Sequence, residues 1–503
     1  MIRRNNRPDS FVLPCFLMVL GLFSCTENKS HSGGPEGRPN ILFIAVDDLR
    51  PQLGVYGEDF MVTPHMDRLA REGRLFTNHY VIVPTCGPSR YALLTGQYPQ
   101  NTAELRNDIF EKTTALQTRP TNPESMVDAF RRNGYYTVGM GKISHSADGF
   151  VYGYTDSVSD VRELPYSWDE FHFNPGKWVT GWNAFFAYAN GENRQSLDRQ
   201  VKPYESGNVG DNGYPDGLTA ELALKQLDVL KERAEPFFLA VGFFKPHLPF
   251  NAPQKYWDLY DEAQLPITNA HDIPENTHNA SLHGSGEFNG YLKGDEKAGL
   301  DHELSPAYAR KLRHAYFAAT SYVDAQIGKV LEALEKNNLS QNTIIVIWGD
   351  HGWHLGDQRV WGKHTLSEYA LRSTLIVKTP GISAPGQPSN AIIESTDIYP
   401  TLLDLTNQEI PDELVGKSFK NILNDPDADS DGMAFSYFRN GISLRTPRYR
   451  MTRYFRDQQP VTELYDYQTD PFETRNVAGA NPEILESLQA KWENGDTGLY
   501  SGE

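Results

Sequence analysis

The chain has 503 residues, of which 39% are apolar and 22% are charged, and its net charge is −18. That length exceeds what one hydrophobic core usually organises, so we expect a large domain and a smaller one. The acidic balance argues against a nucleic-acid-binding protein, which normally presents a basic face. It leaves open a sulfated or carboxylated substrate, because a few cations can dominate the field inside a cleft.

The N-terminal segment is typical of an export signal. Three arginines precede an apolar stretch, residues 11–23, that is too short to span a bilayer comfortably. The stretch ends in Leu22-Phe23-Ser24-Cys25, which resembles the lipobox of bacterial lipoproteins; plain signal-peptidase cleavage nearby is the alternative. We therefore expect residues 1–25 to be a lipoprotein-type signal peptide and residues 26–38 a flexible tether. The protein would be exported to the periplasm or cell surface and held on a bacterial membrane by a lipid anchor at Cys25.

Cysteine usage singles out one residue. Of the three cysteines, Cys15 lies inside the signal and Cys25 at its end, so Cys86 is alone in the folded body. An exported protein with one such cysteine has no disulfide framework. A free cysteine is usually a small buried hydrophobe, and Cys86 therefore either packs in the core or takes part in chemistry.

Short apolar runs alternate with helical patterns along most of the chain. Runs rich in β-branched and aromatic residues predict buried parallel strands at residues 41–46, 135–140, 237–244, 343–348 and 374–378. A helix is predicted from Thr63 and Pro64 to Gly73, and a longer one over residues 307–336. This alternation predicts an α/β fold with a large, mostly parallel sheet sandwiched by helices.

Two regions depart from this pattern. Residues 263–306 lack periodicity and are rich in Asn, His, Gly, Asp and Pro, so we expect them to form a rim over the active site. The C-terminal part contains short runs typical of antiparallel strands, at residues 434–438, 442–444, 449–454 and 463–467, and a final helix near residues 482–492. A catalytic domain is therefore predicted at residues 39–425 and an α+β subdomain at residues 426–503.

Charged or titratable side chains follow four of the predicted strands. In chain order these are Asp47 and Asp48, Lys142 and His145, Lys245 and His247, and Asp350 and His351. Ligands of open α/β sheets bind outside the carboxyl ends of the strands. The four strand ends are therefore expected to meet in one cleft.

The acidic residues of this set suit a hard metal ion. Asp47, Asp48 and Asp350 offer oxygen ligands beside one histidine, His351, and without a thiolate pair, which favours Ca²⁺ or Mg²⁺ over zinc. Adjacent carboxylates would repel each other in a cleft unless a cation neutralised them. By themselves, Asp47 and Asp48 fit a strand-ending turn or a helix N-cap equally well.

The basic residues suit an anionic substrate. Arg90, Lys142 and Lys363 can clamp a tetrahedral oxyanion, and His145 and His247 can transfer protons near neutral pH. Taken singly, a lysine is more often solvated and a histidine more often a structural hydrogen bonder. The interpretation therefore depends on the pattern of strand ends.

The segment around Cys86 is the most specific motif. Its sequence is Val83-Pro84-Thr85-Cys86-Gly87-Pro88-Ser89-Arg90, followed by Tyr91-Ala92-Leu93-Leu94-Thr95-Gly96-Gln97. It resembles the signature of the type I, formylglycine-dependent sulfatases: Cys-x-Pro-Ser-Arg, three residues, Leu-Thr-Gly. The runs at residues 141–145, 245–250 and 349–353 are similar to the iduronate-2-sulfatase-like branch of bacterial polysaccharide sulfatases, and Glu463-Leu464-Tyr465-Asp466 resembles the usual sulfatase C-terminal subdomain. The resemblance covers the chain from about Arg38 to the C-terminus.

This resemblance implies an alkaline-phosphatase-like fold and hydrolysis of sulfate esters on a polysaccharide or oligosaccharide, for example one containing a 2-O-sulfated uronic acid. It implies that a maturation enzyme oxidises Cys86 to formylglycine (3-oxoalanine). One Ca²⁺ ion would be held by residue 86 together with Asp47, Asp48, Asp350 and His351.

The resemblance also implies roles for the remaining cleft residues. Arg90 and Lys142 would position the formylglycine and the sulfate, and His145 would contact the formylglycine hydroxyl. Lys363 would bind the sulfate across the bond that breaks, and His247 would protonate the departing alcohol. No catalytic position is missing, so an inactive homologue is not expected.

Two alternatives stay open at this point. One is another hydrolase of the same architecture: a phosphodiesterase, phosphonate hydrolase or phosphatase. The other is a glycan-binding lipoprotein that kept the fold and lost the chemistry. Lys245, Arg106 and His354 are candidates for contacting a substrate carboxylate, although each fits a solvated rim residue as well.

Overall fold

The computed structural model describes residues 37–112, 123–154, 159–428, 430, 432–456 and 460–500. The predicted signal peptide, the lipobox-like Cys25 and nearly all of the predicted tether lie outside the described residues. Among the helices in the described part, none combines the length and apolar character that crossing a membrane requires.

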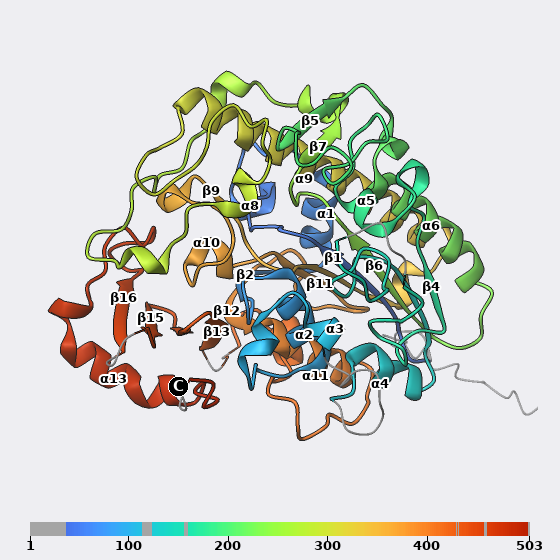
Figure 1. The fold of residues 1–503 in the computed structure, drawn as a ribbon. Coiled ribbons are helices and arrows are strands. Elements are labelled where there is room, and N and C mark those ends of the chain that lie inside the picture. Colours follow the sequence, from blue (N-terminus) through green and yellow to red (C-terminus); the bar gives the residue numbers. More distant parts are fainter. Residues whose placement is uncertain are drawn as a thin grey trace, which may run out of the picture. The chain divides into compact units, whose positions relative to one another are not determined.

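The core of the molecule is an eight-stranded sheet in the order β12-β2-β11-β8-β1-β6-β3-β4 (Figure 1). In that order the strands are Ser389–Glu394, Arg74–Tyr80, Leu375–Lys378, Thr343–Gly349, Asn40–Val46, Phe237–Phe243, Tyr136–Gly141 and Glu170–His172. Neighbouring strands run parallel except where β11 pairs with β2 and β8. The expectation of a mostly parallel sheet is confirmed.

All five predicted strands are present, but the direction expected for the last of them is wrong. β11 runs antiparallel to both of its neighbours. A parallel return from β8 would need a long crossover connection, usually a helix. The chain between β8 and β11 instead holds only short elements, namely β9 (His354–Leu355), β10 (Trp361–Gly362) and α10 (Glu368–Leu371).

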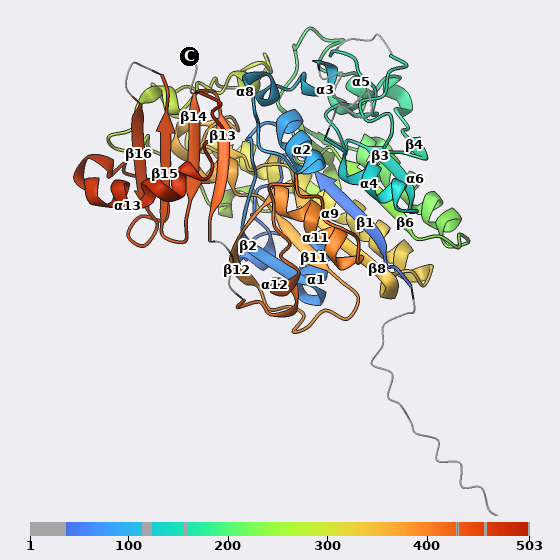
Figure 2. The same ribbon diagram turned by 90° about the horizontal axis from the view of Figure 1, so that it is seen from below.

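Helices cover both faces of the sheet (Figure 2). One face is covered by α1 (Pro64–Glu72), α6 (Pro215–Leu230) and α9 (Pro306–Lys336), which share a hydrophobic core with β1, β6 and β8. The other face is covered by α2 (Cys86–Thr95), α4 (Met126–Arg132), α11 (Ile398–Leu405) and α12 (Lys420–Asn424). The two helices predicted from the sequence are α1 and α9.

A four-stranded antiparallel sheet forms the C-terminal part. It consists of β13 (Ala434–Phe438), β14 (Gly441–Arg445), β15 (Tyr449–Tyr454) and β16 (Val461–Asp466), and α13 (Pro482–Glu493) packs on it. The predicted strands and final helix are confirmed. The hydrophobic core of this sheet includes Val83 and Ala92, which flank Cys86, so the small sheet supports the segment that carries the cysteine.

The remaining elements are short and lie in connections. They are α3 (Ile109–Lys112), α5 (Gly181–Phe185), β5 (Tyr204–Gly207), β7 (Phe250–Pro253), α7 (Gln254–Trp257) and α8 (Gly286–Asn289), together with single 3₁₀ turns. Residues 263–306 contain only short helical turns and isolated bridges, as expected from their composition.

Candidate active site

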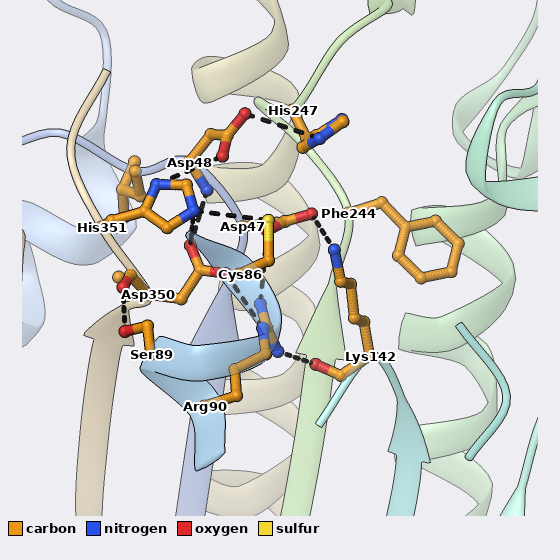
Figure 3. Close-up of polar contacts among 12 residues, drawn as sticks. Asp47, Asp48, Cys86, Ser89, Arg90, Lys142, Phe244, His247, Asp350 and His351 are labelled. Carbon is orange, nitrogen blue, oxygen red and sulfur yellow. Dashed lines mark hydrogen bonds and ion pairs between the residues drawn. The ribbon is translucent and has the colours of Figure 1, made fainter. Parts of the chain in front are cut away.

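Three adjacent strands bring the predicted residues together. The register pairs Val46 of β1 with Phe243 of β6 and with Gly349 of β8, so these strands end at the same level. The residues that follow them therefore meet above one edge of the sheet. Figure 3 shows Asp47, Asp48, His247, Asp350 and His351 around Cys86.

Cys86 is the first residue of α2 and is buried. Its Sγ lies 3.3 Å from Nε2 of His351 and 3.2 Å from Nζ of Lys363. Burial and the nearby Asp47 raise the pKa of the thiol to about 12 despite the charges of the two lysines. The unmodified thiol is therefore protonated at neutral pH and is a poor nucleophile.

The residues after Cys86 lock α2 to the strand ends. Ser89 Oγ donates to the Asp350 carbonyl at 2.5 Å, and Arg90 Nε donates to Asp350 Oδ2 at 2.9 Å. Arg90 also donates to the carbonyl of Lys142. A Cβ at Gly87 would lie 2.9 Å from the backbone of Asn107, so this position accepts only glycine without a shift. The start of α2, which carries Cys86, is therefore fixed between the strand ends at Lys142 and Asp350 and the backbone of Asn107.

The carboxylates next to Cys86 are paired with buried cations. Asp47 Oδ2 lies 2.7 Å from Lys142 Nζ, and Asp48 Oδ1 lies 2.9 Å from Lys363 Nζ. Asp350 Oδ1 accepts the backbone N–H of Asp48 at 2.9 Å. Every one of these side chains is almost completely inaccessible to solvent. The site is therefore a buried ionic cluster with the thiol in its middle.

The donor atoms fit a divalent cation. Ligand atoms of Asp47, Cys86, Asp350 and His351 lie within 4.8 Å of one another, and those of Asp48, Cys86 and His247 form a second such group. Oδ1 of Asp47 and Oδ2 of Asp48 are buried without a hydrogen-bond partner. Buried polar atoms are rarely left unsatisfied, and carboxylate oxygens are the ligands of Ca²⁺ and Mg²⁺. The five expected ligands are thus brought together, and the Asp48 carboxylate lies between the two groups, 3.4 Å from Nδ1 of His351 and 3.8 Å from Nε2 of His247.

The charge balance of the cluster also suits a cation. Burial tends to raise the pKa of Asp47, but the charges of Lys142, His247 and Arg90 outweigh it and hold that pKa well below its usual range. In contrast, burial and the neighbouring Asp47 raise the pKa of Asp350. Burial therefore still disfavours the charged form of Asp350, and a metal ion bound beside it would stabilise that form.

His247 lies beside this cluster on the loop after β6. Its Nδ1 is 2.6 Å from the Leu248 carbonyl, and its Nε2 is 3.8 Å from Asp48 Oδ2 and 3.0 Å from Glu287 Oε1. Burial and the charge of Lys363 lower the pKa of His247 to about 4.

His145 follows β3 and contacts a different set of groups. Its Nε2 lies 3.1 Å from the Tyr154 hydroxyl, and its ring packs 5.3 Å from the ring of Trp182. Burial and the charge of Lys142 lower the pKa of His145 well below its usual range. The expected contact with a modified residue 86 stays a prediction.

The sequence did not point to two residues of the site. Glu287, on α8 in the irregular segment 263–306, has its Oε2 3.6 Å from Lys363 Nζ in addition to its contact with His247. Phe185, on α5, lies under the Lys142 ammonium at 4.2 Å from its ring centre. Neither belongs to a motif, and their only signal was a position in a Gly-rich or an aromatic-rich stretch. The irregular segment does reach the site, as expected for a rim.

Two of the candidates for contacting a substrate carboxylate are wrong. The buried Lys245 ammonium donates to the carbonyls of His247 and Pro249, at 2.9 and 2.6 Å, so it holds the loop in place. His354 is completely buried and bonds to Thr365 Oγ1 at 2.8 Å. The third candidate, Arg106, is exposed and pairs with Asp108 at 3.2 Å. A strand-end or loop position alone did not reveal which side chains face solvent.

Two family models match the chain. The model described as Sulfatase matches residues 39–408, and that described as N-sulphoglucosamine sulphohydrolase, C-terminal, matches residues 349–495.

Individual relatives cover most of the chain. A sulfatase of Formosa agariphila is 30% identical, over 92% of this chain and 88% of its own length. The iduronate 2-sulfatase of Mus musculus is 29% identical, over 79% of this chain and 74% of its own length. The solved structure of a phosphonate monoester hydrolase from Silicibacter pomeroyi superimposes with a TM-score of 0.70 at 24% identity, covering 91% of this chain and 95% of that one. The alkaline-phosphatase-like α/β fold expected from the sequence is thereby confirmed.

Proposed function

Since the chain belongs to the sulfatase family and is a sulfuric ester hydrolase, we propose that it hydrolyses sulfate esters of an oligosaccharide or polysaccharide after oxidation of Cys86 to formylglycine. The observation that carries the proposal is the position of Cys86. It begins a helix, where anions are stabilised, between Lys363 and His351 and beside carboxylate oxygens that lack partners. The sulfated uronic acid named by one relative is the first substrate class to test.

The environment of Cys86 explains why a modification is needed. A thiol with a pKa of about 12 is not a nucleophile at neutral pH. A formylglycine hydrate supplies two hydroxyls on one carbon, one to attack sulfur and one whose deprotonation expels sulfate. A Ca²⁺ ion held by Asp47, Asp48, Asp350 and His351 would supply positive charge that favours deprotonation of the attacking hydroxyl. Maturation therefore requires a formylglycine-generating enzyme acting on the segment around Cys86.

The side chains of the site can stabilise the transferring sulfuryl group. Lys363 Nζ lies 3.2 Å from the sulfur atom of Cys86, so it can contact an oxygen of a sulfate bonded at this position. The Lys142 ammonium pairs with the Asp47 carboxylate and adds a second positive charge to the site. Arg90 donates to Asp350 and to the Lys142 carbonyl and so keeps these groups in register. Fixed positive charges aimed at a developing anion are an effective means of catalysis in a dry site.

His247 is the proton donor in this proposal. Its Nδ1 is held against the Leu248 carbonyl, and its Nε2 faces the space shared by Asp48, Glu287 and Lys363. Because Nδ1–H is held by the Leu248 carbonyl, Nε2 carries a proton only in the imidazolium form, which the contact with Glu287 favours. From that form the Nε2 proton can be delivered to the sugar oxygen as the sulfur–oxygen bond breaks.

The experiment that tests the proposal has two parts. Peptide mass spectrometry of the expressed protein should find an aldehyde in place of the Cys86 thiol, and the same preparation should release inorganic sulfate from a panel of defined sulfated oligosaccharides. An active preparation that contains only unmodified thiol refutes the role of formylglycine.

A phosphonate monoester hydrolase is the second candidate, because one such enzyme shares the fold with a TM-score of 0.70. Matched phenyl sulfate and phenyl phenylphosphonate esters separate the two functions. We expect the sulfate ester to have the higher kcat/KM by at least tenfold, and the reverse order would favour the phosphonate hydrolase.

The location of the protein outside the cytoplasm and its lipid anchor are part of the same proposal. Both rest on residues 11–23 and on Cys25. Expressed in a bacterium with its natural N-terminus, the protein should sediment with membranes, and C25S should release it. Equal sedimentation of both forms would contradict an anchor at this cysteine.

A further inference from the structure

An aromatic wall extends from the two catalytic-site histidines. The ring of Tyr154 lies 4.3 Å from that of Trp182 and 6.0 Å from that of Phe186. His145 contacts this wall through Tyr154, and the ring of His247 lies 6.4 Å from Phe186. Tyr154 is 42% exposed, so the wall is open to solvent at one end. A sugar whose bridging oxygen meets His247 would therefore lie next to these rings.

Arg194 stands against this wall. Its guanidinium carbon is 3.6 Å from the ring centre of Phe186 and 5.3 Å from that of Tyr291. The backbone fixes this position, because the Arg194 N–H donates to the Phe186 carbonyl at 3.1 Å and residues 187 and 193 form a β-bridge. The side chain is half-buried and remains accessible. Arg194 is therefore a positioned cation and not a mobile surface residue.

Among the residues that the structure describes, none provides a counter-ion for the charge of Arg194. Within the described ranges, no carboxylate lies at ion-pairing distance from its guanidinium, whereas Arg90, Lys142 and Lys363 all have such partners. Its Nε and the hydroxyl of the neighbouring Tyr291 are both buried, and neither has a well-aligned hydrogen-bond partner apart from the contact between these two side chains. Buried donors are normally satisfied by protein, water or ligand.

The location of Arg194 connects it to the reacting groups. The Phe186 ring, which lies 3.6 Å from the Arg194 guanidinium carbon, is 6.4 Å from the ring of His247. One aromatic ring therefore separates Arg194 from the proposed proton donor. An arginine in this place can form a bidentate, charge-assisted pair with a planar or tetrahedral anion.

We propose that Arg194, with the Tyr291 hydroxyl, binds an acidic substituent on the same sugar that carries the sulfate ester. The substituent is a carboxylate or a second sulfate. This inference rests on the proposed function, and it assigns the specificity of that site to the half-buried guanidinium instead of to Lys245 or His354, whose polar atoms are already bonded to protein.

A matched series of ligands tests the assignment. The probes are the methyl glycosides of 2-O-sulfated glucose, 2-O-sulfated glucuronic acid and 2,6-di-O-sulfated glucose, which differ only at one carbon. Binding is measured by calorimetry in the C86A background, so that the result does not depend on turnover. Charge-assisted hydrogen bonds to one arginine predict that the acidic sugars bind about tenfold or more tightly than the neutral one. The stronger of the two acidic ligands identifies the substituent.

Variants at position 194 then test whether Arg194 causes the preference for acidic sugars. R194Q should reduce the preference for the acidic sugars at least tenfold, and R194K should keep part of it because the charge remains. R199Q is the matched control: it removes one positive charge five positions away, at an exposed side chain, and should leave the preference unchanged within twofold. A structural role for Arg194 would weaken the binding of all three sugars equally.

Two results overturn the inference. One is a wild-type site without a preference for the acidic sugars, and the other is a preference that R194Q retains. A failure of the proposed function is recognised separately, since it would appear as absent sulfate release by the mature enzyme while the calorimetric preference and its loss in R194Q persist.

Discussion

Two buried ionic clusters in this molecule differ in how completely their carboxylates are satisfied. In the cluster between α10 and the C-terminal sheet, each carboxylate oxygen accepts a hydrogen bond. Glu368 accepts from Tyr80 at 2.9 Å and from Tyr467 at 3.0 Å, and Glu473 accepts from Arg450 at 2.6 Å and from the Glu368 N–H at 3.0 Å. Arg450 also donates to Glu368.

The cluster around Cys86 also pairs buried carboxylates with basic side chains, but its hydrogen bonding is incomplete. Asp47 Oδ1 and Asp48 Oδ2 are buried and accept no hydrogen bond; their nearest cationic atoms lie 3.5 Å away on Arg90 and 3.8 Å away on His247. A complete cluster can only hold two parts of the fold together, whereas an incomplete one costs stability unless a ligand completes it. This difference distinguishes a structural ionic cluster from a candidate active site. Mutations in each cluster test it.

The largest effect is expected from C86A. Sulfate release should fall by about 10⁴-fold or more, because the nucleophile is lost, while the free energy of unfolding should change by only about 1 kcal/mol because one small side chain is removed. Sulfate release by ion chromatography and urea unfolding measure the two quantities. Activity near that of the wild type would sink the assignment.

The opposite result is expected from R450M. This change leaves Glu473 buried without its cation and leaves Glu368 with the more distant Arg445, which should lower the free energy of unfolding by about 3–5 kcal/mol. Activity per folded molecule should stay within about twofold, since Arg450 does not contact the site. R448M is the control, because Arg448 forms an exposed ion pair with Asp466 at 2.8 Å and should leave the urea midpoint nearly unchanged. Equal losses in both variants would contradict a special role for the buried cluster.

The next largest effect is expected from metal binding, which should depend on the cluster around Cys86. After dialysis against a chelator, adding Ca²⁺ at about 100 times its Kd should stabilise the protein by about 2.7 kcal/mol, and D47N should abolish this gain. E303Q serves as the control, because Glu303 belongs to an exposed group with His271 and Asp272 that also has metal-ligand spacing. If E303Q abolishes the gain and D47N does not, the ion binds on the surface instead.

The smallest effect is expected for the free energy of unfolding at acidic pH. Burial tends to raise the pKa of Glu368, but Arg445 and Arg450 outweigh it and lower that pKa from 4.5 to about 2. The resulting stability is complete above pH 4.5 and is lost as the pH falls through 2. At about pH 3.5 the free energy of unfolding should therefore be lower than at pH 6 by about 1.4 kcal/mol from this group. Urea unfolding of E368Q should show a correspondingly smaller dependence on pH over this interval, and an unchanged dependence would count against the pairing.

The parts of the fold that could be predicted are those whose burial is visible in the residue types. β1, β6 and β8 are runs of apolar residues with both faces covered, and α9 repeats its apolar residues with helical spacing. β2 escaped prediction because it includes Arg74, whose buried guanidinium is satisfied by distant carbonyls such as those of Ser383 and Leu423. A strand with polar residues is recognisable only when their partners are known.

The candidate site divides in the same way. Asp47, Lys142, His247 and Asp350 follow strands, so their convergence could be inferred from the order of elements. Glu287 and Arg194 lie on irregular backbone, where neither periodicity nor a motif predicts which way a side chain faces. For Lys245 the prediction was wrong in the other direction. Its strand-end position suggested a contact with substrate, but its ammonium donates to the carbonyls of its own loop.

The sequence by itself predicted the class of fold, a candidate reactive residue and a candidate set of strand-end ligands, because each depends on local residue types in a fixed order. Only the tertiary structure decided the direction of β11, the two carboxylate oxygens left without a hydrogen-bond partner, and the position of the Arg194 guanidinium against the aromatic wall. Those properties depend on which distant groups satisfy a charge or a hydrogen bond. Such pairing arises from the packing of the whole chain, so no single segment encodes it.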